Sequence, residues 1–442
     1  MNDLELLGDL IVCARKAGAD AADAVLVGGA SLSVQRRLGK TEHVERSETR
    51  DLGLRVFVGQ QIAIVSASTV DPASFSELAE RAVAMARVVP EDPYSGLADP
   101  VTPEDSSALE LSDGVEPTTD ELVARAAAAE EAALAVAGVT NSEGADAGFS
   151  RAQMALVTSV GFVGQAVRSS HSISAVALAG SGTGMQRDYD FHSTVHLADL
   201  DDPAGIGRRA GERAVARLNP TRPATGKLPV IYDPRVSGGL VGHLAGAING
   251  AAIARRTSFL LDKLGARIFA PGIVIRDDPR RRRGMRSRVF DAEGVRTSVK
   301  NLVENGVLMG WLLDLRSARQ LGMQSTGHAS RGTSGPPSPA PSNLFMAAGT
   351  LSPAELMADI KLGIYVTELV GMGVNGLTGD YSRGAAGFVI RDGKLAEPVA
   401  EITIAGNLLE IFSHLTPAND LVFRRGTDAP TVRVESLTMA GS

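Results

Sequence analysis

The chain has 442 residues, of which 44% are hydrophobic and 21% are charged, and its formal net charge is −7. These proportions are those of a folded globular protein, and the length exceeds the roughly 250–300 residues that one hydrophobic core usually reaches. The excess of acidic residues argues against nucleic-acid binding, and a single cysteine, Cys13, excludes an internal disulfide framework.

The N-terminal segment predicts a helix and shows no targeting sequence. Residues 1–10 lack a basic region followed by a long apolar run, so we expect no signal peptide and a cytoplasmic protein. Apolar residues at helical spacing predict a helix over residues 4–16, which Gly18 ends. Cys13 lies beside these apolar residues and is expected to be a small packed side chain rather than a reactive thiol.

Strand and helix signals then alternate. Apolar runs on both sides of the turn Gly59-Gln60 predict a β-hairpin over residues 52–65, and strands are expected within residues 154–178. Three N-cap patterns predict further helices, which begin at residues 71–72 (Asp-Pro), at residues 118–121 (a capping box) and at residues 202–203 (Asp-Pro).

Two segments of this half resemble each other. The tetrapeptide FVGQ occurs at residues 57–60 and 162–165, and both segments later carry DPA followed by ERAVA. We therefore predict one N-terminal α/β domain over residues 1–218, formed by duplication of a unit found at residues 1–95 and 118–218. Chance similarity between alanine-rich helices is the alternative.

The second half predicts a different domain. Residues 219–227 contain two prolines and a glycine and are expected to form a hinge to a domain over residues 228–442. The dipeptides Asn305-Gly306 and Asp392-Gly393 lie between apolar runs, which is typical of antiparallel hairpins. We expect an α+β protein whose C-terminal domain is rich in antiparallel β structure, with a mobile loop over residues 328–343.

Residues 235–256 form the least polar stretch of the chain. Between its flanking arginines, small and apolar residues are interrupted only by His243 and Asn249. Five glycines and the near-central histidine argue against a membrane span, so we expect a buried central helix in the C-terminal domain.

Six motifs carry a resemblance to a known family. They are residues 241–243 (VGH), 255–260 (RRTSFL), 290–297 (FDAEGVRT), 325–328 (STGH), 378–388 (TGDYSRGAAGF) and 401–408 (EITIAGNL). Through these motifs the chain resembles the TldD/PmbA (TldE) proteins, a resemblance that covers essentially the whole chain and is closer to the PmbA/TldE branch.

The resemblance also carries expectations about zinc. In the TldD branch the corresponding helix carries His-Glu-x-x-x-His, and these residues bind zinc with a downstream cysteine. Aligned on His243, this chain has Gly238 and Gly239 in place of the first histidine and the glutamate, and its only cysteine lies near the N-terminus. Glycine supplies neither a ligand nor a base, so we expect no catalytic residue, metal ligand or cofactor in this chain.

The resemblance therefore implies a non-catalytic partner of a zinc-bearing TldD-like subunit, in a metallopeptidase that acts on small or unfolded peptides. Such a chain would form part of the wall of the active-site cavity, and an extended peptide would pair with its sheet edges. The candidate peptide-contact residues are His243, His328, Asp380, Tyr381 and Arg383. The structural alternatives are a hydrogen-bonded core histidine at position 243 and an ion pair that pins the turn at residues 380–383. We expect no membrane contact, and a homodimer is plausible when the partner is absent.

Two other functions stay open. An autonomous metallopeptidase would need His243, His328 and Asp380 to converge on one metal ion. A regulatory binding protein would agree with the family's older description as a modulator of DNA gyrase.

Three further patterns are better explained by structure than by function. Residues 371–376 fit the G-x-G-x-x-G pattern, but no helix is expected after them, so we predict a glycine-rich loop. His192 and His196 are predicted on a strand, too far apart to share a metal ion, and facing solvent. The arginine-rich residues 280–288 are predicted to form a solvated loop, with a partner contact as the second interpretation.

Overall fold

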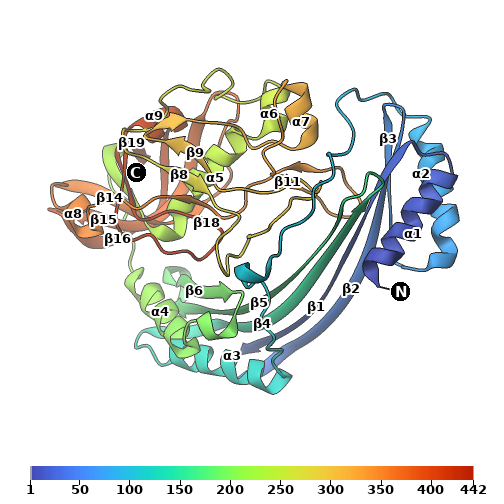
Figure 1. Ribbon diagram of the computed structural model, residues 1–442. Coiled ribbons are helices and arrows are strands. Elements are labelled where there is room, and N and C mark those ends of the chain that lie inside the picture. The colour runs from blue at the N-terminus through green and yellow to red at the C-terminus, as the bar shows by residue number, and fades with distance from the viewer. Residues whose placement is uncertain (1, 442) are drawn as a thin grey trace.

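A six-stranded sheet curves along one side of the protein, and a smaller barrel lies against its concave face (Figure 1). The computed structural model describes residues 2–441. The N-terminal part consists of α1 (Asp3–Lys16), β1 (Ala21–Arg37), β2 (Lys40–Val58), β3 (Gln61–Ala67), α2 (Phe75–Ala86), α3 (Thr119–Leu134), β4 (Val139–Thr158), β5 (Val163–Ala179), β6 (Gln186–Thr194) and α4 (Pro203–Ala216).

All strands of this sheet are antiparallel to their neighbours, in the order β3-β2-β1-β4-β5-β6. Helices α1 and α2 cover one end of the outer face and α3 and α4 cover the other (Figure 1). The predicted turn at Gly59-Gln60 joins β2 to β3, and the capping box at Thr118 and Glu121 begins α3. Each half has the order helix, three strands, helix.

The tetrapeptides that suggested duplication lie at different places in the two halves. The first ends β2 and forms the following turn, whereas the second begins at Phe162, just before β5, and continues into that strand. The duplication therefore stays a prediction, supported by the element order and not by these residues.

Helices α3 and α4 approach each other closely because of a glycine. A Cβ atom at Gly207 on α4 would lie 1.8 Å from the carbonyl oxygen of Ala129 on α3. The contact is filled by small residues, and Ala126, Ala129 and Ala210 are fully buried there. Only glycine fits this position without moving the backbone of one helix.

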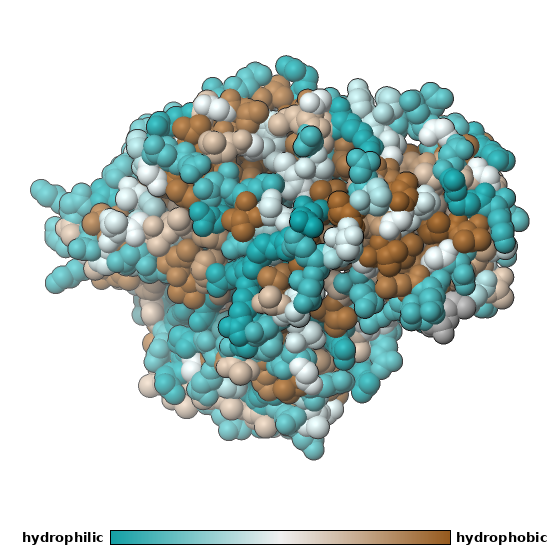
Figure 2. All heavy atoms as spheres, in the orientation of Figure 1, coloured by the Kyte–Doolittle hydropathy of each residue, from teal (hydrophilic) through white to brown (hydrophobic). Residues whose placement is uncertain are grey.

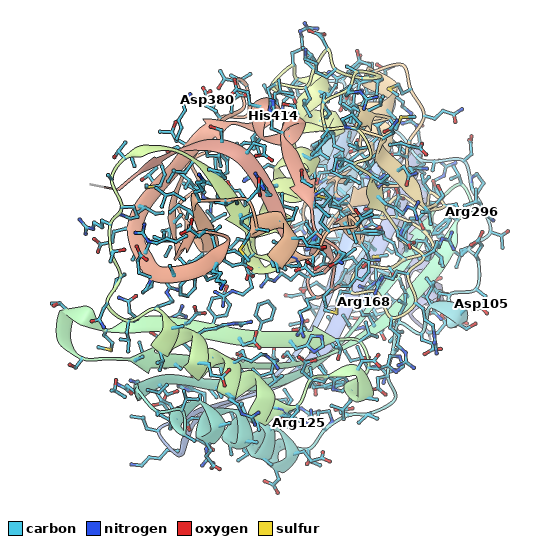
Figure 3. The ribbon with its side chains drawn as sticks, turned by 90° about the vertical axis from the view of Figure 1, so that its left-hand side faces the viewer. Asp105, Arg125, Arg168, Arg296, Asp380 and His414 are labelled. Atoms are coloured by element: carbon cyan, nitrogen blue, oxygen red, sulfur yellow. The ribbon has the colours of Figure 1, made fainter. Side chains whose placement is uncertain are left out.

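The C-terminal part is a barrel with a helix packed against it. It contains β7 (Gly226–Tyr232), α5 (Pro234–Ala247), α6 (Gly250–Ala254), β8 (Ile275–Asp277), β9 (Lys300–Glu304), β10 (Val307–Leu308), α7 (Leu315–Gln320), β11 (Ala329–Ser330), β12 (Ser338–Pro339), β13 (Leu344–Met346), α8 (Pro353–Met357), β14 (Leu362–Val370), β15 (Asp380–Arg391), β16 (Lys394–Asn407), α9 (Leu408–Ser413), β17 (Leu415–Pro417), β18 (Thr427–Asp428) and β19 (Val432–Ala440). The order β16-β15-β14-β7-β19 is closed by pairing of β16 with β19, and Figure 3 shows these strands curling into a ring.

The predicted α+β fold with a C-terminal part rich in antiparallel strands is confirmed. Asn305-Gly306 joins β9 to β10 and Asp392-Gly393 joins β15 to β16, with positive φ at all four residues, as a two-residue turn of this kind requires. The segment predicted as a hinge, residues 219–227, is held to the barrel, because the Thr221 N–H donates to the carbonyl oxygen of Pro398 at 2.8 Å.

The single helix predicted over residues 235–256 is wrong in one respect. Helix α5 ends at Ala247, and Asn249 caps the separate helix α6 by accepting a hydrogen bond from the Ala251 N–H at 3.0 Å. The Gly250 N–H donates to the carbonyl oxygen of Leu312 instead of continuing the helix. Asparagine competes with helical hydrogen bonds through its own side chain, which explains the break.

Within residues 2–441, no helix combines the length and the apolar character needed to cross a bilayer.

The close approach at Gly207 predicts a sharp difference between two glycine substitutions. Gly207→Ala should destabilise the protein by roughly 1–3 kcal/mol, because the methyl group forces α3 and α4 apart. Gly8→Ala on α1, where a Cβ meets no atom within 4 Å, should be neutral or stabilise by up to ~1 kcal/mol. Urea unfolding of both variants checks this, and equal effects would contradict the packing described here.

Candidate functional site

Helix α5 carries a stripe of glycines on its open side. A Cβ atom at Gly239, Gly242 or Gly246 would meet no atom within 4 Å, and all three positions are exposed. Their spacing of three and four residues places them on one side of the helix, together with His243. The opposite side, with Leu240, Val241 and Leu244, is buried in the main core. The backbone of α5 is therefore accessible along this stripe.

His243 stands in the stripe as a half-buried, neutral imidazole. Its ring lies edge-on to Tyr381, with centroids 5.9 Å apart. Burial, and then the guanidinium of Arg383, lower the pKa of His243. Among residues 2–441 its ring has no hydrogen-bond partner, so the alternative of a hydrogen-bonded core histidine is wrong.

Tyr381 and Arg383 reach His243 because they share one face of β15. Side chains on a strand alternate between faces, so residues 381 and 383 point to the same side and Asp380 points to the other. Tyr381 is buried, and burial raises the pKa of its hydroxyl, which interacts with Tyr232. The Nε of Arg383 donates to the carbonyl oxygen of Val370 at 3.3 Å.

Asp380 forms no ion pair with Arg383 in the described residues. Its carboxylate accepts a hydrogen bond from the Thr378 hydroxyl at 2.6 Å and lies 3.4 Å from the side-chain nitrogen of Asn407. Figure 3 shows Asp380 at the outer rim of the barrel. The ion pair expected to pin this turn is therefore wrong, because the strand places the two charges on opposite faces.

A depression of about 610 Å³ lies beside Tyr381, lined by residues 372–376 and 380–382. The loop of residues 371–376 joins β14 to β15, and no helix follows it, so the predicted glycine-rich loop is confirmed. Gly373 is required there, since a Cβ would lie 1.8 Å from the carbonyl oxygen of Ser382. Met372 at the tip is 90% exposed, which leaves an apolar side chain in solvent next to the depression.

The structure separates His328 from the other candidates. Its ring is buried, with Nδ1 2.8 Å from the Thr326 hydroxyl and Nε2 3.1 Å from the Asp277 carboxylate. Ser342 donates to the same carboxylate, so this histidine holds two chain segments together. The surrounding residues 328–343, predicted as a mobile loop, pair through β11 and β12 and pack against the large sheet, where Gly53 makes room for Thr333.

The two histidines near β6 are also structural. His192 is buried rather than solvent-facing, 3.0 Å from the Asp201 carboxylate, and His196 lies 2.9 Å from the carbonyl oxygen of Glu110. The prediction that they face solvent is wrong for His192, because its ring lies on the face of β6 that α4 and the segment before it cover.

The arginine-rich residues 280–288 are not a solvated loop. Arg282 and Arg283 both bind the Glu110 carboxylate, at 2.6 and 2.7 Å, and Arg280 pairs with Glu104. Arg288 is largely buried and donates to the carbonyl oxygen of Ala340 at 3.1 Å. The prediction failed because its acidic partners come from the segment between α2 and α3, more than 150 residues earlier.

These pairs belong to a polar interface between the two parts of the chain. Arg235 at the start of α5 binds Asp188 on β6 at 2.8 Å, and Arg316 binds Asp92 at 2.6 Å. Figure 2 shows hydrophilic side chains gathered near the middle of the face where the parts meet.

The most deeply buried charges of the interface form a cluster that the sequence did not reveal. Asp23 binds Arg331 at 2.7 Å and Arg55 at 2.8 Å, and Arg55 lies 3.6 Å from Glu293. All four side chains are at most 6% exposed. Burial raises the pKa of Glu293 to about 7 against the opposing effect of Arg55.

The donors around α5 do not fit a zinc ion. A side chain at Gly238 would begin 2.7 Å from the carbonyl oxygen of Thr427 on β18, so a ligand at this position has no room. Gly239 faces open space, which leaves His243 as the one donor on the helix. In the part of the chain that the structure describes, no group of three His, Cys, Asp or Glu residues could hold a metal ion. Cys13 packs against the core of α1 and α2.

Burial of Glu293 predicts a specific dependence of stability on pH. Because its pKa is raised from 4.5 to about 7, the stability that this group contributes is present below pH 4.5 and is lost as the pH rises through 7. Glu293→Gln should flatten the pH profile of the free energy of unfolding in this window by at most about 3 kcal/mol. The pKa of Asp23 is lowered, so the stability that this group contributes changes only at more acidic pH. Denaturant unfolding between pH 4.5 and 7.5 checks this, with the exposed Glu42→Gln as control, and an unchanged slope in Glu293→Gln would contradict it.

Three family descriptions match consecutive parts of the chain: PmbA/TldA metallopeptidase domain 1 over residues 22–86, the central domain over residues 113–218 and the C-terminal domain over residues 225–441. The chain is 35% identical over 425 residues to Metalloprotease PmbA of Escherichia coli O157:H7, covering 96% of this chain and 92% of that one. It is 35% identical over 433 residues to a Metalloprotease PmbA homolog of Haemophilus influenzae, covering 97% and 94%.

Solved structures share the whole fold. A putative modulator of DNA gyrase from Bacteroides thetaiotaomicron superposes with a TM-score of 0.89 and 26% identity, over 99% of this chain and 98% of that one. TldE from Thermococcus kodakarensis superposes with a TM-score of 0.88 and 21% identity, over 99% and 100%.

Proposed function

The chain belongs to the PmbA/TldD metallopeptidase family, and we propose that it is the non-catalytic subunit of a peptidase whose second, TldD-like subunit binds the zinc. The substrates are small or unfolded peptides. Within this pair, the TldD-like chain provides the metal, the base and the water, and the present chain provides part of the wall that holds the peptide. Both subunits work in the cytoplasm.

The observation that carries this proposal is the environment of Gly238 and Gly239. Water activation on zinc needs at least three protein ligands and a nearby carboxylate. At Gly238 the Thr427 carbonyl oxygen occupies the space that a ligand side chain would need, and at Gly239 no side chain is present. An autonomous peptidase would need His243, His328 and Asp380 to meet, yet His328 is buried against Asp277 and Asp380 points away from His243's face of β15.

The open stripe of α5 supports a role in peptide binding. Glycines expose the helix backbone, and His243 and Arg383 lie beside it with Tyr381. A bound peptide needs room along the surface and a few polar groups that fix its orientation. Exposed apolar residues of the neighbouring loop, Met372 and Leu377, are 90% and 62% exposed and suit contact with the second subunit or with the peptide.

A peptide-cleavage assay with the two subunits, each alone and both mixed, tests which subunit is catalytic. We expect an unstructured peptide to be cleaved by the mixture of this chain with a TldD-like chain, and by neither chain alone. His243→Ala in this chain should leave at least half of the kcat of the mixture, because the imidazole activates no water, and any lost peptide contact should appear in the KM. Cleavage by this chain alone, abolished by His243→Ala, would refute the proposal.

A substitution that fills the open stripe tests peptide contact. Gly242→Leu should fold normally, because a Cβ there meets no atom within 4 Å, and should raise the KM of the mixture several-fold by obstructing the stripe. Gly8→Leu on α1, which is equally free of neighbours, is the matched control and should change nothing. Size-exclusion chromatography of the two mixtures shows whether the subunits still associate. A KM equal to that of the control, with association intact, would exclude this stripe from peptide binding.

A further inference from the structure

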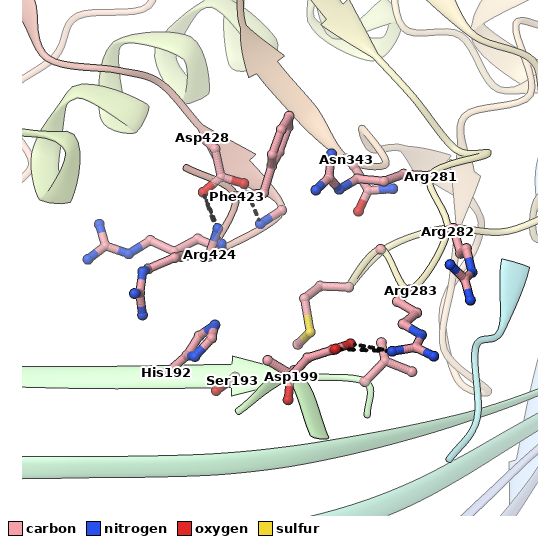
Figure 4. Close-up of a pocket in the computed structure, with 16 residues that line it drawn as sticks. His192, Ser193, Asp199, Arg281, Arg282, Arg283, Asn343, Phe423, Arg424 and Asp428 are labelled. Atoms are coloured by element: carbon pink, nitrogen blue, oxygen red, sulfur yellow. Dashed lines mark hydrogen bonds and ion pairs between the residues drawn. The ribbon is translucent and has the colours of Figure 1, made fainter. Parts of the chain in front are cut away.

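A cleft of about 510 Å³ lies between β6 and two C-terminal segments, residues 281–285 and 423–428 (Figure 4). Its walls carry five arginines: Arg281, Arg282, Arg283, Arg424 and Arg425. The carboxylates in its lining are Asp199 and Asp428. None of the stripe residues Gly239, Gly242, His243 and Gly246 lines this cleft.

Three of the five arginines are neutralised by carboxylates. Arg282 and Arg283 share Glu110, Arg283 also binds Asp199 at 2.9 Å, and Arg424 binds Asp201 at 2.9 Å. The Asp428 carboxylate is occupied by backbone, because it accepts the N–H groups of residues 424, 425 and 426 at 3.0 Å each.

Arg281 and Arg425 have no carboxylate within ion-pair distance among residues 2–441. The guanidinium carbon of Arg281 lies 3.3 Å from the ring centroid of Phe423, and within the same range its nitrogens make no hydrogen bond. Arg425 lies over Phe191 at 5.0 Å and donates to the carbonyl oxygen of Arg235. Burial lowers the pKa of both guanidinium groups, and this effect exceeds the opposing attraction of the Asp428 carboxylate, which lies beyond ion-pair distance of both.

The geometry suits an anion. A guanidinium stacked on an aromatic ring keeps its in-plane N–H groups free, and these bind phosphate or carboxylate as a fork. Nη1 of Arg424 is also buried without a partner among the described residues. The five arginines face four carboxylates, Glu110, Asp199, Asp201 and Asp428, so one positive charge is left over. A phosphate group is negatively charged and has three strong acceptor oxygens, which can accept N–H groups from several arginines at once. The volume is within the range of small-molecule sites.

We propose that the cleft between β6 and residues 423–428 binds the phosphate group of a small molecule, held by Arg281, Arg425 and Arg424. The ligand would bridge the N-terminal sheet and the C-terminal part, since β6 forms one wall and residues 281–285 and 423–428 form the others. The site is independent of the peptidase role and of the partner subunit.

Calorimetric titration of the full chain with inorganic phosphate at constant ionic strength tests the site. We expect saturable binding of one phosphate per chain, with a rise in the midpoint of thermal unfolding as phosphate is added. Arg281→Gln should weaken binding about tenfold or more, because a charge-assisted hydrogen bond is lost. This variant should fold, since the Arg281 guanidinium makes no hydrogen bond. Arg391→Gln, which removes an exposed ion pair with Glu397 elsewhere on the barrel, is the control and should bind as the wild type does.

Each other outcome overturns the proposal. Absence of saturable phosphate binding to the wild-type chain, or unchanged affinity in Arg281→Gln, would remove the site. Acetate that binds as tightly as phosphate would assign the cleft to carboxylates. A phosphoserine peptide that binds more than tenfold tighter than both phosphate and pyrophosphate would assign it to a phosphorylated protein segment instead of a small molecule.

Discussion

The contact between Gly238 and the carbonyl oxygen of Thr427 is the constraint on which the functional account depends. A Cβ atom at this position would lie 2.7 Å from backbone, so the start of α5 and β18 approach each other only because residue 238 is glycine. The same approach that lets the helix pack against β18 removes the space for a metal ligand. The glycine at position 238 therefore allows the close packing of this helix and at the same time leaves no side chain there that could bind zinc. The open side of the helix stays accessible.

A polar interface connects the two parts of the chain around this helix. Its ion pairs include buried groups such as Asp23 with Arg331, for which the cost of removing charges from water is large and the loss of one partner is larger still. Such an interface favours one relative placement of sheet and barrel, because every buried charge has to find its partner. The cleft with Arg281 and Arg425 is the part of this interface where positive charge is left over.

Local chemistry could be predicted from the sequence, and long-range partners could not. The turns at Asn305-Gly306 and Asp392-Gly393 were predictable because few residues adopt positive φ at two successive positions. The long strand β1 was not recognised, since small and polar residues predominate in its distal half and the start of β2 is exposed, so neither segment shows an alternating apolar pattern. At the site, sharing of one strand face brought Tyr381 and Arg383 to His243, but the pairing of His328 with Asp277, 51 residues earlier, left no local signal.

Metal analysis of the isolated chain, purified without chelators and equilibrated with excess zinc before desalting, tests the central claim most directly. Without a ligand at Gly238 or Gly239, the account predicts that zinc is washed out and remains far below one ion per chain. One tightly held zinc per chain that is lost in His243→Ala would contradict it, because the chain would then build a metal centre from its own side chains.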